Sequence, residues 1–234
     1  MNLKSKFLFS ISLLGLLCVL VPDSIRAQTL VGTSNAPANC LPFDCAVSQG
    51  LTTYQQVYAS SAFAGDTPFN QISFFLSTAD MGTQDSGDYD IYFSYTSQAV
   101  GGLSSASPSA NIGADYTLFG SYDLAGGAAP STLTFTGTTF TYDPALGNLL
   151  MTVTLGPGVS QGTSPVGYYN SDGSGTVTSR AGFGTTSFAD DYGLVTEFND
   201  VSGVTPEPSS LLLFGSGIAL IGMAMSVRRR ATRE

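Results

Sequence analysis

The stretch DYDIYFSY, residues 88–95, alternates between two kinds of side chain and decides the fold class. Its more apolar positions are Tyr89, Ile91, Phe93 and Tyr95, and its more polar ones are Asp88, Asp90, Tyr92 and Ser94. Successive side chains of a β-strand point to opposite faces, so the pattern is typical of a strand that is buried on one side. Such a face needs a second layer to cover it.

Similar short segments recur through residues 28–203, separated by Gly, Asp, Asn, Ser and Pro. One stripe consists of Ile72, Phe74 and Leu76, and another consists of Leu149, Met151, Val153 and Leu155. We expect strands at residues 53–59, 71–77, 89–96, 115–123, 132–135, 139–142, 149–155, 166–169, 176–182 and 193–198. The sequence therefore predicts an all-β domain, an antiparallel β-sandwich of jelly-roll-like kind.

The charge of this span limits what it can bind. Residues 28–203 contain fourteen Asp and Glu side chains and a single basic one, Arg180, which gives a net charge of −13. A field of this sign repels phosphate backbones and anionic lipids, so we expect no nucleic-acid partner. Cations and neutral glycans are the ligands that this charge favours.

The first 27 residues have the pattern of a secretory signal peptide. Lys4 and Lys6 precede an apolar run that ends at Pro22, and Ala27 supplies a small residue before the expected cleavage site. An uncleaved N-terminal membrane helix is the alternative.

The C-terminus combines three features in a fixed order. Pro206, Glu207 and Pro208 form a stiff, extended segment. Residues 209–227 are apolar or small throughout, and a helix of that length spans about 28 Å, close to the hydrocarbon thickness of a membrane. The basic tail, residues 228–234, contains Arg228, Arg229, Arg230 and Arg233. By the positive-inside rule, we expect this tail to stay cytoplasmic and residues 28–203 to face outward.

This order of tripeptide, apolar helix and arginine cluster resembles the PEP-CTERM sorting signal, also called the ice-binding-protein C-terminal domain. The resemblance implies that an exosortase-type enzyme cuts the chain near residues 206–208. It also implies an inner-membrane-anchored precursor that is later released or attached at the cell surface or in the exopolysaccharide matrix. The chain accordingly divides into a signal peptide (1–27), an outer domain (28–203) and a sorting and anchoring segment (204–234).

Three segments of the outer domain resemble a recurrent outer module of PEP-CTERM proteins. They are YQQVY at residues 54–58, QISFF at 71–75 and FTYDPALGNLL at 140–150. The last indicates two strands joined by a turn that contains Asp143-Pro144 and Gly147-Asn148. This second resemblance implies no activity.

Cys40 and Cys45 are the cysteines that remain after removal of a signal peptide. An oxidising, exported compartment favours a disulfide between them, with free thiols as the alternative. A metal site at this pair is not expected, because the chain contains no histidine that could complete it.

The densest group of oxygen donors lies at Asp85, Asp88 and Asp90, with a glycine between them. Carboxylates spaced in this way can fold around Ca²⁺, the one cofactor that the sequence suggests, so these three are a candidate calcium site. The pattern is shorter than an EF-hand loop, and a solvated turn at a strand edge is the alternative. Asp190 and Asp191 form a second candidate.

The outer domain lacks residue types on which many enzymes depend. It contains no histidine, no lysine and no Gly-x-Ser-x-Gly motif. We therefore expect a protein without catalytic activity that serves as a structural or adhesive component of the cell surface or extracellular matrix. The alternative is a carbohydrate-binding module of jelly-roll type, with Tyr92, Tyr168 and Tyr169 as candidate glycan contacts.

Overall fold

The computed structural model describes residues 28–35 and 37–201, which lie within one compact unit, Arg26–Val201. The strands of these residues are β1 (Thr29–Val31), β2 (Leu51–Tyr58), β3 (Thr67–Phe75), β4 (Thr83–Thr96), β5 (Thr117–Ala128), β6 (Thr132–Tyr142), β7 (Asn148–Leu155), β8 (Ser171–Asp172), β9 (Thr178–Gly184), β10 (Phe188–Asp190), β11 (Gly193–Leu194) and β12 (Thr196–Asn199). Three 3₁₀ turns accompany them: η1 (Ser60–Ala62), η2 (Pro108–Ala110) and η3 (Pro144–Leu146).

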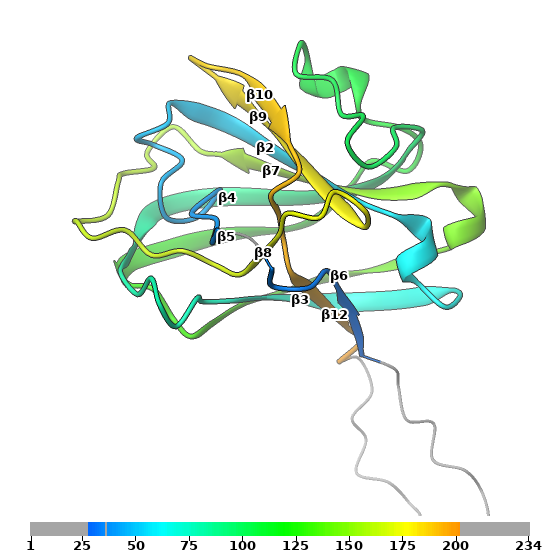
Figure 1. Ribbon diagram of the computed structural model, residues 1–234, viewed down its shortest axis with the longest axis horizontal. Coiled ribbons are helices and arrows are strands. Elements are labelled where there is room, and N and C mark those ends of the chain that lie inside the picture. The colour runs from blue at the N-terminus through cyan, green and yellow to red at the C-terminus, as the bar shows by residue number, and fades with distance from the viewer. Residues whose placement is uncertain (1–27, 36, 202–234) are drawn as a thin grey trace, which may run out of the picture. The chain divides into compact units, whose positions relative to one another are not determined.

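Two antiparallel sheets face each other and enclose the core (Figure 1). One has the strand order β1-β12-β3-β6, and the other has the order β10-β9-β2-β7-β4-β5. If the β9–β10 hairpin at its edge is set aside, the second sheet has the order β2-β7-β4-β5, and each sheet then contains four strands. Along the chain, nearly every strand lies in the opposite sheet from the strand before it. This is the strand order of a jelly roll. The prediction of an all-β antiparallel sandwich is confirmed.

The alternating stretch 88–95 forms the second half of β4 and behaves largely as its pattern predicts. Tyr89, Ile91 and Phe93 are fully buried, whereas Asp88 is exposed. Ser94 departs from the pattern because it is buried on the opposite face. There the connection 97–116 covers part of the sheet and packs Leu103 against buried residues of β2 and β7.

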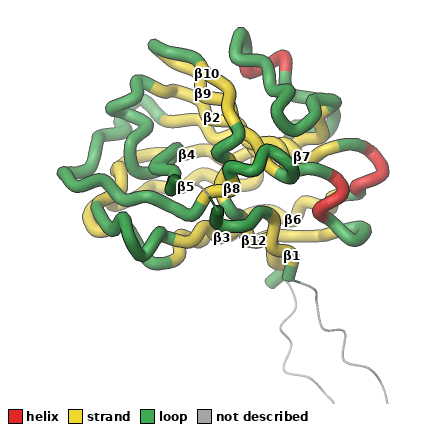
Figure 2. The backbone as a smooth tube through the Cα atoms, viewed as in Figure 1, coloured by secondary structure: helices red, strands yellow, loops and turns green. Residues whose placement is uncertain are grey.

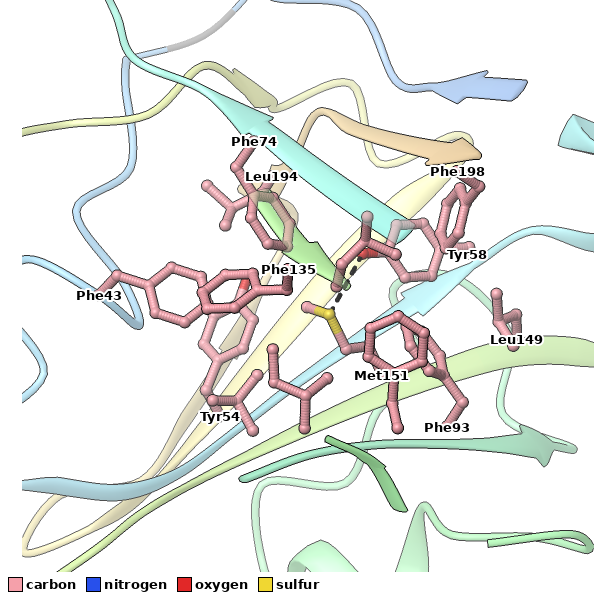
Figure 3. Packing of buried hydrophobic residues seen from close by; sticks show 14 of the residues in the cluster. Phe43, Tyr54, Tyr58, Phe74, Phe93, Phe135, Leu149, Met151, Leu194 and Phe198 are labelled. Carbon is pink, nitrogen blue, oxygen red and sulfur yellow. Dashed lines mark hydrogen bonds between the residues drawn. The ribbon is translucent and has the colours of Figure 1, made fainter. Parts of the chain in front are cut away.

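Phenylalanine and tyrosine rings fill the space between the sheets, in keeping with a chain that has no tryptophan. Figure 3 shows rings from both sheets meeting in this core. The centre of the Phe69 ring on β3 lies 4.9 Å from the centre of the Phe93 ring on β4 and 4.8 Å from that of the Phe198 ring on β12. Full burial of one such side chain contributes about 1.5–3 kcal/mol, so this layer dominates the stability of the sandwich.

Residues 132–135 and 139–142, predicted as two strands, form the single strand β6. Gly137 does not end the strand but lies in an irregularity, between the pairs Gln71–Thr136 and Phe69–Phe140. A Cβ atom at Gly137 would collide with the backbone carbonyl of Phe119 on β5. The glycine therefore permits β5 and β6 to approach closely where the chain passes from one sheet to the other.

Two further predicted strands differ in the structure. Residues 166–169 form no strand, and Tyr169 makes only isolated bridges to Asn39 and Leu76. Residues 193–198 divide at Val195 into β11, which pairs with β8, and β12, which pairs with β1 and β3. Periodicity alone predicts one strand here because it does not reveal a change of pairing partner.

Long connections join several of the strands (Figure 2). The connection from β4 to β5 covers residues 97–116, and that from β7 to β8 covers residues 156–170. Residues 37–50, which precede β2, form a third long segment, and with residues 156–170 it supplies Asn39, Asp44, Tyr168 and Tyr169, which are discussed below.

Candidate functional site: a cleft around Arg180

A cleft of about 460 Å³ lies beside the β9–β10 hairpin. Three parts of the chain form its walls: residues 37–49, Tyr168 before β8, and the hairpin together with Tyr192. The polar and aromatic residues that line it are Asn39, Gln49, Tyr168, Arg180, Phe188, Asp190 and Tyr192.

Arg180 lines the cleft and is held by Asp190, its direct cross-strand partner in the hairpin. Nε donates to one carboxylate oxygen at 2.7 Å, and Nη2 donates to the other at 3.1 Å. Two parallel bonds of this kind form the strongest arginine–carboxylate geometry. The Arg180 side chain is 12% exposed and that of Asp190 is 32% exposed, so the pair is partly shielded from water.

Asn39 joins the arginine to the opposite wall. Its side-chain oxygen accepts hydrogen bonds from Nη1 of Arg180 and from the backbone N–H of Leu41. Its amide nitrogen donates to the backbone carbonyl of Tyr192 at 3.0 Å, and the Tyr192 N–H in turn donates to Asp190. The polar groups of the cleft are therefore positioned by one another before any ligand arrives.

Two aromatic rings lie beside the guanidinium group. Its central carbon lies 5.3 Å from the centre of the Phe188 ring and 5.8 Å from that of the Tyr192 ring, within the range of cation–π attraction. Phe188 and Tyr168 are partly buried, and Tyr192 is 40% exposed. A cleft that combines exposed ring surface with a few fixed polar groups is suited to a neutral, polar ligand.

The predicted disulfide between Cys40 and Cys45 is present and forms part of the cleft wall. The residues within this short loop turn inward, and the Phe43 ring is fully buried between the sheets. It lies 5.4 Å from the ring of Phe74 and 5.0 Å from that of Phe135. The disulfide loop is thus anchored in the core on one side and lines the cleft on the other.

The three tyrosines predicted as glycan contacts do not lie together. Tyr168 lines the cleft. The prediction for Tyr169 is wrong, because its ring is fully buried beside Phe43 and cannot reach a surface ligand. Tyr92 lies on the outer face of β4, where it stacks on Tyr116 with ring centres 4.7 Å apart and planes inclined by 11°.

The three aspartates of the predicted calcium site are also separated. Asp85 is fully buried and accepts hydrogen bonds from the backbone N–H groups of Val47 and Gly162. Asp88 is exposed on β4 opposite Asp123, and Asp90 is partly exposed on the same outer face. Asp85 lies an even number of residues before the buried Tyr89, so the alternation of β4 places it on the inner face and places Asp88 and Asp90 on the outer one. Within residues 28–35 and 37–201, no three Asp, Glu or Cys side chains are grouped so that they could hold a metal ion.

Most of this cleft could not be predicted from the sequence. Arg180 is the single basic residue of the domain, and this feature of the sequence could have marked it as a candidate binding residue. The sequence suggests Asp190 as part of a second calcium site, whereas the structure pairs it with Arg180. Asn39 carried no signal, since its partner Arg180 is 141 residues away in the sequence.

The C-terminal segment was compared with known families. Residues 204–230 match the family model of the PEP-CTERM protein-sorting motif. The chain carries a PEP-CTERM sorting signal. The resemblance predicted from Pro206, Glu207 and Pro208 with the residues after them is thereby confirmed. Comparison with curated proteins and with solved structures finds no match.

The PEP-CTERM motif marks the chain as an exported protein that is processed for the cell surface, and it implies recognition by an exosortase-type sorting enzyme. The motif, the apolar residues 209–227, the arginines of residues 228–234 and the predicted signal peptide all lie outside the described residues. Among residues 28–35 and 37–201, no helix is long and apolar enough to cross a membrane.

Proposed function

We propose that this chain is a non-catalytic structural or adhesive component of the cell surface or extracellular matrix. It is made as a precursor that residues 209–227 anchor in the inner membrane, and an exosortase then processes it. The observation that carries the proposal is the PEP-CTERM motif at residues 204–230, directly after a single β-sandwich domain. Processing by the sorting enzyme would leave this sandwich at the cell surface or in the matrix. Residues 28–203, which contain it, have a net charge of −13.

The state of the charged groups in the cleft supports a binding role over a catalytic one. Arg180 and Asp190 are bonded to each other at two positions, and Asn39 fixes the arginine further. General acid–base catalysis needs a group that can give up or accept a proton during the reaction. Groups committed in this way instead offer a fixed hydrogen-bonding surface.

The test of this function is the behaviour of a host that carries the sorting enzyme. Cell fractionation should place the mature chain in the envelope or matrix fraction. Deletion of the chain should reduce the retention of cells or exopolysaccharide in surface-attached films. Unchanged films in the deletion strain would contradict the structural or adhesive role.

Carbohydrate binding is a second candidate function, and the cleft around Arg180 specifically favours it. Tyr168, Phe188 and Tyr192 provide apolar ring surface beside the exposed amide group of Gln49. Sugars present both apolar C–H faces and hydroxyl groups, so this combination matches their chemistry. The exopolysaccharide of the host is the ligand that the sorting route makes available.

A glycan array probed with the wild-type protein and two tyrosine variants tests this candidate. Tyr192→Ala removes a ring at the cleft that is 40% exposed. Tyr116→Ala is the matched control, because it removes a ring of nearly equal exposure, 41%, that stacks on Tyr92 away from the cleft. Tyr192→Ala should abolish binding while Tyr116→Ala retains it. The reverse result would place the glycan on the Tyr92–Tyr116 stack, and no binding by the wild type would exclude a glycan ligand.

A further inference from the structure

Four oxygen-bearing side chains are buried in the same part of the core, where residues 43–47 pack against β4 and the Phe43 ring lies beside the rings of Tyr89 and Tyr169. They are Asp44, Asp85, Tyr89 and Tyr169, and all four are fully buried. The backbone N–H of Asp85 donates to the carbonyl of Phe43 at 2.7 Å, which joins the two segments that carry the carboxyl groups. Two carboxyl groups buried side by side are rare, because an ionised carboxylate loses its hydration.

Most of these oxygens have no hydrogen-bond partner among the described residues. No backbone or side-chain group of that part of the chain bonds either carboxyl oxygen of Asp44, or the hydroxyl of Tyr89 or Tyr169. Asp85 is better satisfied, since Gly162 N–H lies 3.0 Å from one oxygen and Val47 N–H lies 3.4 Å from the other. Buried polar side chains are bonded in the large majority of cases, so three such residues in one place indicate a bound species.

The four groups share one electrostatic environment. Burial and the charge of Asp85 raise the pKa of Asp44 to about 8. Burial and the charges of Asp85 and Asp44 raise the pKa of Tyr89, and burial with the charge of Asp44 raises that of Tyr169. The single basic side chain of residues 28–203, Arg180, is bonded to Asp190 and does not neutralise them.

Gly167 leaves space for this arrangement. A Cβ atom on Gly167 would lie 2.5 Å from a carboxyl oxygen of Asp44 and 2.9 Å from the side chain of Ala129. Any larger residue would displace the carboxyl group, so the backbone approaches Asp44 closely only because a glycine is present.

We propose that Asp44, Asp85, Tyr89 and Tyr169 bind one Ca²⁺ ion in the core of the sandwich. The donors are two carboxyl groups and two hydroxyls, all hard oxygen ligands, and a divalent cation would take the place of the proton that burial favours on Asp44. Ca²⁺ accepts six to eight oxygens in flexible geometry, whereas Mg²⁺ demands strict octahedral coordination and usually keeps several waters. A buried site that combines side chains of strand β4 with side chains of two loops therefore suits Ca²⁺ better.

This site differs from the calcium site predicted from the sequence, of which it keeps Asp85 alone. It joins β4 to the disulfide loop through Asp44 and to the loop before β8 through Tyr169. The same two segments carry Cys45 and Tyr168, which line the cleft. Calcium would thus fix both walls of the cleft from the inside.

The experiment uses full-length protein in a mild detergent, unfolded and then refolded in either EDTA or millimolar Ca²⁺. Calcium content after desalting and thermal unfolding by circular dichroism are measured. We expect one bound Ca²⁺ per chain and a melting temperature about 5 °C or more higher in Ca²⁺ than in EDTA, with a smaller effect of Mg²⁺. Equal melting temperatures together with calcium-free protein would overturn the proposal and indicate a protonated carboxyl pair.

Two carboxylate-to-amide variants locate the ion. Asp44→Asn should lose the bound calcium and the thermal response, whereas Asp90→Asn on the outer face of β4 should keep both. The opposite result would overturn the proposal in favour of the outer aspartates. If Asp44→Asn does not fold, Tyr169→Phe decides, because it removes only a hydroxyl. Its affinity for Ca²⁺ should fall about tenfold or more, and an unchanged affinity would contradict the assignment.

Discussion

Replacement of Arg180 tests whether the cleft is organised as the structure indicates. Arg180→Ala removes two charge-assisted hydrogen bonds to Asp190, one to Asn39 and the contacts with two rings. Charge-assisted bonds contribute about 1.5–3 kcal/mol each and a cation–π contact about 0.5–1 kcal/mol. Because the Asp190 side chain is 32% exposed, water can hydrogen-bond to it in the variant and offsets part of this lost stabilisation. We expect the free energy of unfolding to fall by about 3 kcal/mol.

Arg180→Lys should lose about half as much, since it keeps the charge but not the two-pronged geometry. Urea unfolding followed by far-UV circular dichroism measures both, because the chain has no tryptophan for fluorescence. Ser105→Glu, on an exposed connection, is the control: it changes the net charge by the same unit and should cost under about 0.5 kcal/mol. The reasoning fails if Arg180→Ala costs no more than this control.

Three further outcomes are expected. Replacing both Cys40 and Cys45 with Ser should lower the free energy of unfolding by about 2 kcal/mol in urea unfolding, since the loop is short; an unchanged midpoint would mean that the loop is held without the bond. Gly137→Ala should destabilise the domain by about 1–3 kcal/mol, because its Cβ meets the Phe119 carbonyl, and a neutral effect in the same assay would contradict that close approach. Replacing residues 206–208 with Ala should leave export intact but block processing, so that mass spectrometry finds the intact C-terminus; normal processing of this variant would refute recognition of the tripeptide.

Much of the fold could be predicted because a strand that is buried on one face has an apolar side chain at every second residue. The stripes Tyr89, Ile91 and Phe93 in β4 and Leu149, Met151 and Val153 in β7 are fully buried. Strand ends were less predictable. Gly137 resembled a break but allows a close approach of two strands, and the division at Val195 depends on which sheet each half joins.

The candidate site was only partly predictable, since its residues come from separate parts of the chain. Tyr168 and Tyr169 are adjacent in the sequence, yet the first lines the cleft and the second lies in the core. Whether a ring is exposed depends on which segment covers it, and that information is absent from the local pattern. Asp85, by contrast, could have been separated from Asp88 and Asp90 by alternation alone, because residues three apart on a strand point to opposite faces.

The sequence by itself determined the β-sandwich class, the disulfide, the acidic character of the outer domain and the PEP-CTERM signal. These properties depend on composition, on short spacings or on a contiguous motif. Tertiary structure alone decided that Asn39 holds Arg180 and that Tyr89 and Tyr169 lie beside the segment that carries Asp44. A jelly roll pairs strands that are distant in sequence, so side chains more than a hundred residues apart become neighbours only when both sheets have formed.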